Sequence, residues 1–287
     1  MKKRRLTERD PLLTSSYDYE LPEELIATYP ISPRDHARLL VYDRRNRSIT
    51  HSRFDQIDSF LPPECAIVFN DTKVIKARLY GSKESGGAIE LLINRPLDAY
   101  RINVYVRGRV KEGTKLLFDR RLVATVIKLH DDGSRDVEFS LAGERLRFEE
   151  LLPLLDEIGH IPLPPYLGRE DDSSDEREYQ SVFARREGAV AAPTASLHFT
   201  DELFAAVSAR HPHAFVTLHV GLGTFAPVKA DALANHVMHE ERYEVCHATA
   251  RAVNEAKAAG RRVIAVGTTS VRVLEGVAAQ HRGKIVP

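Results

Sequence analysis

The spacing of apolar and polar residues changes character along the chain. Between residues 74 and 149, short apolar runs alternate with Gly, Asp and Pro turns, at 89–93, 102–106, 122–127 and 137–139. Short strands that recur every roughly 10–12 residues are typical of a small antiparallel barrel or sandwich. We therefore predict an inserted antiparallel β-barrel domain over residues 74–149.

The segments on either side predict alternating strands and helices. Apolar runs suited to buried strands lie at 66–69, 215–220 and 263–266. Helix-like segments with capping or stop residues follow at 200–211 (Thr200), 248–259 (Gly260) and from Ser270. This order is typical of a mostly parallel sheet with helices on its faces. We predict a main α/β domain made of residues 17–73 and 150–287, preceded by a basic tail over 1–16.

Prolines mark two further segments. Pro22 suits the first turn of a short helix over 21–26. The proline-rich segment 161–166 cannot continue a helix or a central strand, because each proline lacks its N–H and restrains the preceding residue. We expect it to be a stiff extended loop that returns the chain to the main domain.

Composition narrows the classes of protein. The 287 residues carry 41 basic and 41 acidic side chains, so any RNA partner must bind a local patch instead of a global positive field. No apolar stretch approaches the roughly 18 residues of a membrane span, and no secretory signal follows the basic N-terminus. We expect a cytoplasmic protein with no membrane contact. Cys65 and Cys246 have no spacing suited to a thiolate zinc site, and we interpret both as buried thiols.

Two predicted strand ends carry residues suited to ligand binding. After the strand at 263–266 come Gly267, Thr268, Thr269 and Ser270, where free backbone N–H groups and hydroxyls meet at a helix start. This turn suits a carboxylate, phosphate or ribose oxygen, although simple helix capping also explains it. Arg272 and Glu275 follow three residues apart, as a surface pair or a ligand clamp.

The strand at 215–220 runs into His219-Val-Gly-Leu-Gly-Thr-Phe225, in which Gly221 and Gly223 leave room for a ligand near the backbone. It does not match the dinucleotide fingerprint. The small residues of 188–198 leave space for a flat heterocycle or for close backbone packing.

Histidines and basic residues supply the remaining candidate chemistry. Seven of the 12 histidines lie between His198 and His247, but their spacing lacks a zinc motif, so we predict no metal. A neutral histidine suits proton transfer or hydrogen bonding to a base. Basic side chains cluster in or beside the β insertion, as solvated strand faces or as an RNA patch: Lys73, Lys76, Arg78, Lys83, Arg107, Arg109, Lys111, Lys115, Arg120 and Arg121.

A series of longer motifs gives the chain a family resemblance. They are Arg-Leu-Leu-Val at 38–41, Asn-Asp-Thr-Lys-Val at 70–74, Ala-Arg-Leu at 77–79, Ile-Pro-Leu-Pro-Pro-Tyr at 161–166, Tyr-Gln at 179–180, Ala-Ala-Pro-Thr-Ala at 191–195, Leu-His-Phe at 197–199, Thr-Leu-His-Val-Gly-Leu-Gly-Thr-Phe at 217–225, Met-His at 238–239 with Glu241, and Val-Gly-Thr-Thr-Ser-Val-Arg at 266–272 with Leu-Glu at 274–275. In this order they resemble the S-adenosylmethionine:tRNA ribosyltransferase-isomerases of queuosine biosynthesis. The resemblance spans residues 17–275.

The resemblance implies a mixed α/β domain interrupted by a β-barrel, and an unusual use of S-adenosylmethionine. Such enzymes transfer and isomerise its ribosyl unit onto 7-aminomethyl-7-deazaguanine at the tRNA wobble position. Epoxyqueuosine in tRNA is the product, and adenine and methionine leave. We expect S-adenosylmethionine as co-substrate, that tRNA as partner, and a monomer.

The chemistry assigns candidate roles to particular residues. The sulfonium acidifies the adjacent ribose carbon, so His219 or Glu241 is a candidate base, and His198 a candidate proton donor to adenine. Methionine's carboxylate suits the 267–270 turn or Arg272. The candidate substrate-binding residues are Asp71, Lys73, Arg78, Thr194, Gly221, Gly223, Thr224, Thr268, Thr269, Ser270, Arg272 and Glu275.

Two departures from the family pattern shape the alternatives. Ser196 stands where the family usually has glycine, and the sequence stops at Pro287, before a C-terminal segment of several dozen residues that family members normally carry. A second hypothesis is therefore a truncated, inactive homologue that retains tRNA binding, although the retained residues 267–275 argue against it, since a binding remnant has no need of a donor site. An ordinary methyltransferase is disfavoured by the lack of a Gly-rich first βα turn.

Overall fold

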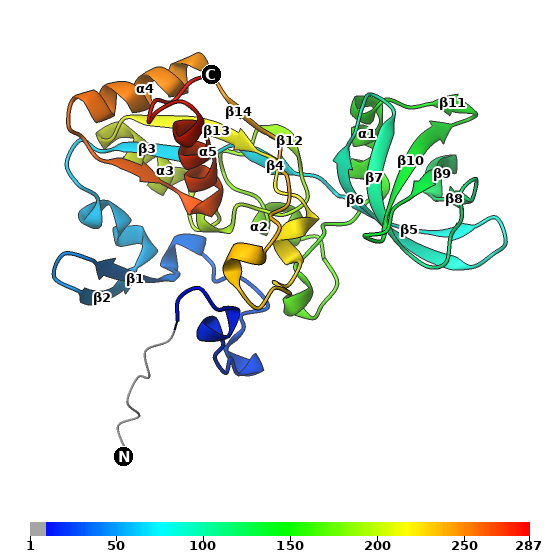
Figure 1. The fold of residues 1–287 in the computed structure, drawn as a ribbon, viewed down its shortest axis with the longest axis horizontal. Coiled ribbons are helices and arrows are strands. Elements are labelled where there is room, and N and C mark those ends of the chain that lie inside the picture. Colours follow the sequence, from blue (N-terminus) through cyan, green and yellow to red (C-terminus); the bar gives the residue numbers. More distant parts are fainter. Residues whose placement is uncertain (1–9) are drawn as a thin grey trace.

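The computed structural model describes residues 10–287 (Figure 1). Residues 1–9 of the predicted basic tail lie outside this range. From Asp10 onward the chain is tied to a distant loop, since the Thr14 N–H donates to the Asp231 carbonyl at 2.9 Å. A single 3-10 turn, η1 (Thr14–Tyr17), follows.

The inserted segment forms a closed antiparallel barrel, to the right in Figure 1. The six strands in its ring pair in the order β10–β7–β6–β5–β8–β9, and β9 pairs back to β10. Their bounds are β5 (Arg78–Lys83), β6 (Ala88–Pro96), β7 (Arg101–Arg107), β8 (Lys115–Leu117), β9 (Leu122–Leu129) and β10 (Ser134–Leu141), with the short β11 (Glu144–Arg145) added to β10. The predicted fold class, an α/β protein with an inserted β-barrel, is confirmed.

The barrel has an apolar interior because its strands alternate in polarity. In β6, Ile89, Leu91 and Ile93 are buried while the residues between them are more exposed, the two-residue period that places alternate side chains on one face of a strand. The helix α1 (Phe148–Ile158) packs into the same apolar cluster through Leu151 and Leu155. The apolar core of the barrel therefore includes side chains of α1, the helix that follows its last strand.

The main sheet has four strands in the order β14–β13–β3–β15. Both β13 (His213–Leu218) and β15 (Val263–Ala265) run parallel to β3 (Ala66–Asn70), whereas β14 (Tyr243–Val245) is antiparallel to β13. All of β3 is buried, as expected for a strand with both faces covered. The predicted mostly parallel sheet is confirmed.

Helices cover both faces of this sheet. Val68 packs with residues of α4 (His247–Ala258) and α5 (Gly267–Gln280), while its neighbours Ile67 and Phe69 pack with α3 (Asp201–Arg210) and a group of aromatic rings. The predicted cap of α3 is present, because the Leu203 N–H donates to the Thr200 hydroxyl at 3.1 Å. The parallel strands therefore all end at one edge of a sheet that is shielded above and below.

The remaining elements connect these two parts. An exposed hairpin, β1 (Arg38–Asp43) and β2 (Ser48–Arg53), packs against the 3-10 segment η4 (Phe54–Phe60). Two short strands, β4 (Thr72–Val74) and β12 (Arg186–Ala189), pair in parallel near the crossing to the barrel. The short helix α2 (Asp175–Glu178) follows the proline-rich segment 161–166, which is extended up to the turn η6 (Pro165–Leu167).

Three local predictions need correction. The helix expected over 21–26 is one 3-10 turn, η2 (Glu23–Leu25), because no residue in it is buried to stabilise a longer helix. Helix α5 begins at Gly267 instead of Ser270. Cys65 is buried as predicted, but Cys246 is exposed because it lies at the N-terminus of α4, beyond the short edge strand β14.

Candidate functional site

A cavity of about 420 Å³ lies at the edge of the sheet where β13 and β15 end. Three segments that are distant in sequence line it: the loop after β13, the irregular stretch before β14 and the first turns of α5. Carboxyl ends of parallel strands are the usual binding edge of an α/β sheet. The lining residues are Val220, Gly223, Thr224, His236, Met238, His239, Glu241, Thr268, Thr269, Val271 and Arg272.

The start of α5 presents unpartnered polar groups at this edge. Gly267 has a φ of +83°, a conformation that favours glycine, and it turns the chain from β15 into the helix. No side chain caps the helix. The hydroxyls of Thr269 and Ser270 are buried and, within residues 10–287, have no hydrogen-bond partner. Since buried polar groups are normally paired, these N–H groups and hydroxyls form a site able to receive an oxygen-bearing ligand.

Arg272 of α5 is the basic residue of the cavity, and two groups of the stretch before β14 bind its side chain. The Arg272 guanidinium contacts the Glu241 carboxylate at 2.5 Å and donates to the His239 carbonyl at 2.5 Å. Glu275, which the sequence placed beside Arg272, is exposed and does not line the cavity. The pairing therefore fixes the stretch before β14 against α5, and it leaves Arg272 oriented along the cavity wall.

Close packing of the backbone shapes the opposite wall. A Cβ atom added to Gly223 would lie 2.4 Å from the His239 ring, far inside contact distance. Glycine is therefore required here for the loop η8 (Leu222–Phe225) to approach the stretch that carries His239.

His219 lies just before this loop, beside the cavity lining. Its Nδ1 lies 2.8 Å from the Thr72 hydroxyl of β4, and burial lowers the pKa of the imidazole below its usual value. The neighbouring Asp71 carboxylate accepts a hydrogen bond from the Thr217 hydroxyl at 2.6 Å. The ends of β3 and β13 thus hold this histidine in a fixed orientation against Thr72 and Gly188, one residue before Val220 of the cavity lining.

Comparison with known proteins decides the family. The sequence profile of the queuosine biosynthesis protein family matches residues 14–285. The chain belongs to this family. It is 57% identical over 264 residues to the S-adenosylmethionine:tRNA ribosyltransferase-isomerase of Sulfurimonas denitrificans, covering 92% of this chain and 76% of that protein. The enzyme of the same name from Nitratiruptor sp. is 53% identical over 266 residues, covering 93% and 77%.

A solved structure is also similar in sequence. The crystal structure of an S-adenosylmethionine tRNA ribosyltransferase from Thermotoga maritima is 32% identical and covers 92% of this chain and 72% of that one, with a TM-score of 0.42. The chain spans about three quarters of the length of its Sulfurimonas and Nitratiruptor relatives. The predicted resemblance to this enzyme family is confirmed.

Other candidate residues of the queuosine family motifs lie outside the cavity lining. His198 packs against Phe54 with ring centroids 5.2 Å apart, and burial lowers the pKa of this histidine. Lys73 pairs with Glu187 at 2.7 Å, and Arg78 lies 3.1 Å from Glu90 on the barrel. Thr194, Gly221 and Ser270 are also absent from the lining, although Ala195, next to Thr194, faces Gly267 at the start of α5.

The barrel contributes a residue to this region that the sequence did not single out. The Asn94 side chain of β6 accepts from the Leu222 N–H at 3.3 Å and donates to Asn103 at 2.9 Å. Asn103 in turn donates to Ser134 and Asp136, each at 3.1 Å. The only signal in the sequence is that Asn94 and Asn103 interrupt apolar strands. His236, Met238 and His239 were likewise not among the predicted binding residues.

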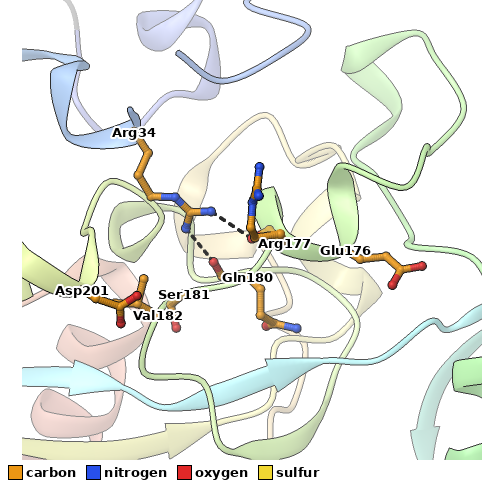
Figure 2. A pocket seen from close by; sticks show the side chains of 7 residues that line it. All are labelled: Arg34, Glu176, Arg177, Gln180, Ser181, Val182 and Asp201. Carbon is orange, nitrogen blue, oxygen red and sulfur yellow. Dashed lines mark hydrogen bonds between the residues drawn. The ribbon is translucent and has the colours of Figure 1, made fainter. Parts of the chain in front are cut away.

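A second hollow of about 440 Å³ lies between the N-terminal segment and the stretch 176–182 (Figure 2). Arg34 extends toward it, but its guanidinium donates to the Gln180 and Arg177 carbonyls at 2.8 and 2.9 Å. The Gln180 amide in turn bonds the backbone of Val74 in both directions. Arg34 is therefore occupied in holding the N-terminal segment on the main domain, and the Gln180 side chain in holding β4.

Residues 10–287 contain neither a cluster of metal-binding side chains nor a membrane-spanning helix. No group of three or more His, Cys, Asp and Glu side chains in that range is arranged to hold a metal ion. Nor does that range contain a helix long and apolar enough to cross a membrane.

Proposed function

We propose that this chain transfers and isomerises the ribosyl unit of S-adenosylmethionine onto 7-aminomethyl-7-deazaguanine at the tRNA wobble position. Epoxyqueuosine in tRNA is then the product, with release of adenine and methionine. The observation that carries the proposal is the cavity, because it joins Gly223, Thr224 and the α5 start into one site. Family membership and the names of the relatives support the same reaction.

The cavity offers what an amino acid joined to a ribose requires. The N–H groups at the start of α5 and the unpartnered hydroxyl of Thr269 suit the methionine carboxylate, and Arg272 provides the adjacent cation. Glu241, held by Arg272, brings a negative charge near the sulfonium. We place S-adenosylmethionine between the loop after β13 and the first turns of α5.

His219 is the base that we propose. The sulfonium acidifies the ribose carbon beside it, and a neutral imidazole can take that proton. Nδ1 lies 2.8 Å from the Thr72 hydroxyl, which can also donate to the Arg186 carbonyl at 3.4 Å, and the base that we propose is the tautomer with the proton on Nδ1 and Nε2 as the acceptor. Glu241 is the weaker candidate for this step because its carboxylate is engaged by Arg272. His198 remains our candidate donor to the leaving adenine.

The tRNA partner requires a positive surface, which we first place on the barrel. Arg107, Arg109 and Lys111 are exposed at the end of β7 and after it. Reversing these three charges should weaken tRNA binding and flatten its dependence on salt, because each lost phosphate contact removes released counterions. An unchanged salt slope would show that these three residues are solvated surface and do not contact tRNA.

We further propose that the protein acts as a monomer in the cytoplasm.

The test is adenine release from S-adenosylmethionine with tRNA carrying the 7-aminomethyl-7-deazaguanine base. We expect adenine only when that base is present, and a matched tRNA with guanine at the wobble position serves as the control. His219→Ala should reduce turnover while leaving donor affinity nearly unchanged, since an interaction made in the transition state does not contribute to binding. tRNA binding without adenine release would instead identify a non-catalytic homologue.

A further inference from the structure

The hairpin formed by β1 and β2 projects from the main domain on the side away from the barrel (Figure 1). It forms a two-stranded sheet of its own and packs on η4. Leu39, Val41 and Ser52 are partly buried toward the domain, whereas the alternate residues of both strands are exposed. One face of the hairpin is therefore presented entirely to solvent.

The hairpin carries a strong excess of positive charge. Residues 38–53 contain five arginines and one acidic residue, in a chain whose formal net charge is zero. The acid, Asp43, accepts from the Arg45 backbone N–H at 2.9 Å in the turn, and Arg53 pairs with Asp55. Within residues 10–287, the side chains of the other four have no ion-pair or hydrogen-bond partner: Arg38, Arg44, Arg45 and Arg47.

The register of the hairpin places like charges opposite each other, which lowers the stability of the folded protein. Arg38 lies directly opposite Arg53, and like charges placed opposite each other destabilise a strand pair. The turn then adds three more arginines within four residues, at 44, 45 and 47. A polyanion bound to this face would relieve the repulsion, because its phosphates would supply the missing partners.

Apolar side chains lie on the same outward face. Tyr42 opposes Ile49, and Leu40 opposes His51; Leu40, Tyr42 and Ile49 are 57%, 52% and 59% exposed. An exposed aromatic ring among arginines is the combination that binds nucleic acid, since the ring stacks on an unpaired base while the guanidinium groups contact phosphates.

We propose that the β1–β2 hairpin is a docking surface for the tRNA substrate, separate from the donor cavity. The arginines of the turn contact backbone phosphates, and Tyr42 stacks on an unpaired base. The inference rests on the proposed function for the identity of the RNA. It goes beyond that function in placing an RNA contact on the main domain, on the far side from the barrel. A tRNA held at both places would be fixed in orientation on the protein.

The test compares tRNA affinities over a range of salt concentrations. Arg44→Glu/Arg45→Glu/Arg47→Glu should reduce the slope of log affinity against log salt by about 2 to 3, at about 0.7–0.9 for each phosphate contact. Tyr42→Ala should weaken binding about 5- to 150-fold with an unchanged slope, because stacking releases no counterions. The substituted side chains are exposed, so thermal unfolding should occur no lower than in the wild type, and the triple variant should be slightly stabilised because it removes like charges from the turn.

The matched control reverses three exposed arginines elsewhere, Arg251→Glu/Arg262→Glu/Arg282→Glu. Arg282 has a φ of +53° and Arg47 one of +57°, so both triple variants include one position in the left-handed region. A slope reduced equally by the control, or unchanged by the hairpin triple variant, would overturn the proposal. Adenine release is measured in parallel. Loss of tRNA affinity in the hairpin variants of a chain that releases no adenine would support the docking surface while rejecting the proposed reaction.

Discussion

The barrel and the cavity of this protein are stabilised in opposite ways. The barrel is a closed ladder of strands around fully buried side chains such as Leu79, Leu91 and Phe139. The walls of the cavity include a long stretch, 219–242, that contains 3-10 turns but no strand or α-helix, and Val237 within it is 84% exposed. The barrel is therefore stabilised by packing of buried side chains. The cavity is stabilised by a few specific contacts, because binding requires loops that can adjust.

The largest expected effect is a loss of stability when a buried side chain of the barrel is removed. Phe139→Ala removes a fully buried ring of the barrel core and should lower the free energy of unfolding by about 3–5 kcal/mol. Donor affinity of the folded fraction should not change. Guanidinium unfolding followed by circular dichroism measures the first quantity, and calorimetry the second.

Val237→Ala is the matched control in the cavity stretch. Its side chain is exposed, so the unfolding free energy should change by less than about 0.5 kcal/mol. A loss of stability comparable with that of Phe139→Ala would show that this stretch is packed as firmly as the barrel, and the comparison would fail.

The next largest effect concerns the ion pair of the cavity. Arg272→Ala should weaken S-adenosylmethionine binding by about 1–3 kcal/mol, the scale for losing a hydrogen bond to a charged group. It also releases Glu241 and the His239 carbonyl. Calorimetric titration with the donor measures the effect, and Arg251→Ala, a change to an exposed arginine of α4, is the control. Wild-type affinity in Arg272→Ala would show that the donor binds elsewhere.

The contrast between the barrel and the cavity also explains which features the sequence could predict. The barrel follows from local alternation, visible in β6 as Ile89, Leu91 and Ile93, and the buried strand β3 follows from one continuous apolar run. The cap at Thr200 is likewise a local signal. Such features depend on residues a few positions apart, so the sequence displays them directly.

The cavity depends on contacts that local patterns do not contain. The glycine and threonine loops were predicted from strand ends, but Arg272 was paired with Glu275 by helical spacing, whereas Glu241 is its partner from another segment. Asn94 reaches Leu222 across the two parts of the fold. Nothing in a single sequence indicates such a pair, because a lone polar residue in an apolar strand has many explanations.

Asn94 gives a smaller effect that links the two regions. Asn94→Ala leaves the Leu222 N–H and the Asn103 side-chain amide oxygen without their partner, and the hydrogen bond to Leu222 is long at 3.3 Å. We expect donor affinity to fall by about 1 kcal/mol through displacement of the loop. Asn46→Ala, in the exposed hairpin turn, is the control. An unchanged donor affinity would show that the barrel does not position this loop.

The smallest expected effect is the pH dependence of stability that His219 contributes. Burial lowers the pKa of its imidazole in the folded chain, whereas the unfolded chain has the ordinary value near 6.5. Between these two values the unfolded state binds more protons, so this contribution to stability rises with pH. It is fully present above about pH 6.5 and is lost as pH falls through the folded pKa.

His219→Gln removes this titration and tests its sign. Because burial also lowers the pKa of His198, the wild type will lose stability toward low pH for more than one reason, and only the difference between proteins is informative. Denaturant unfolding at several pH values between 5 and 8 should show a smaller loss in His219→Gln than in the wild type. His198→Gln should reduce the loss independently, and the double variant should reduce it by the sum, since His219 contacts Thr72 whereas His198 packs on Phe54, so the two side chains have different partners. A steeper acid loss in His219→Gln would mean that the imidazole is charged in the folded chain. It would then be unable to serve as the base beside the cavity, and Glu241 would become the better candidate for proton abstraction.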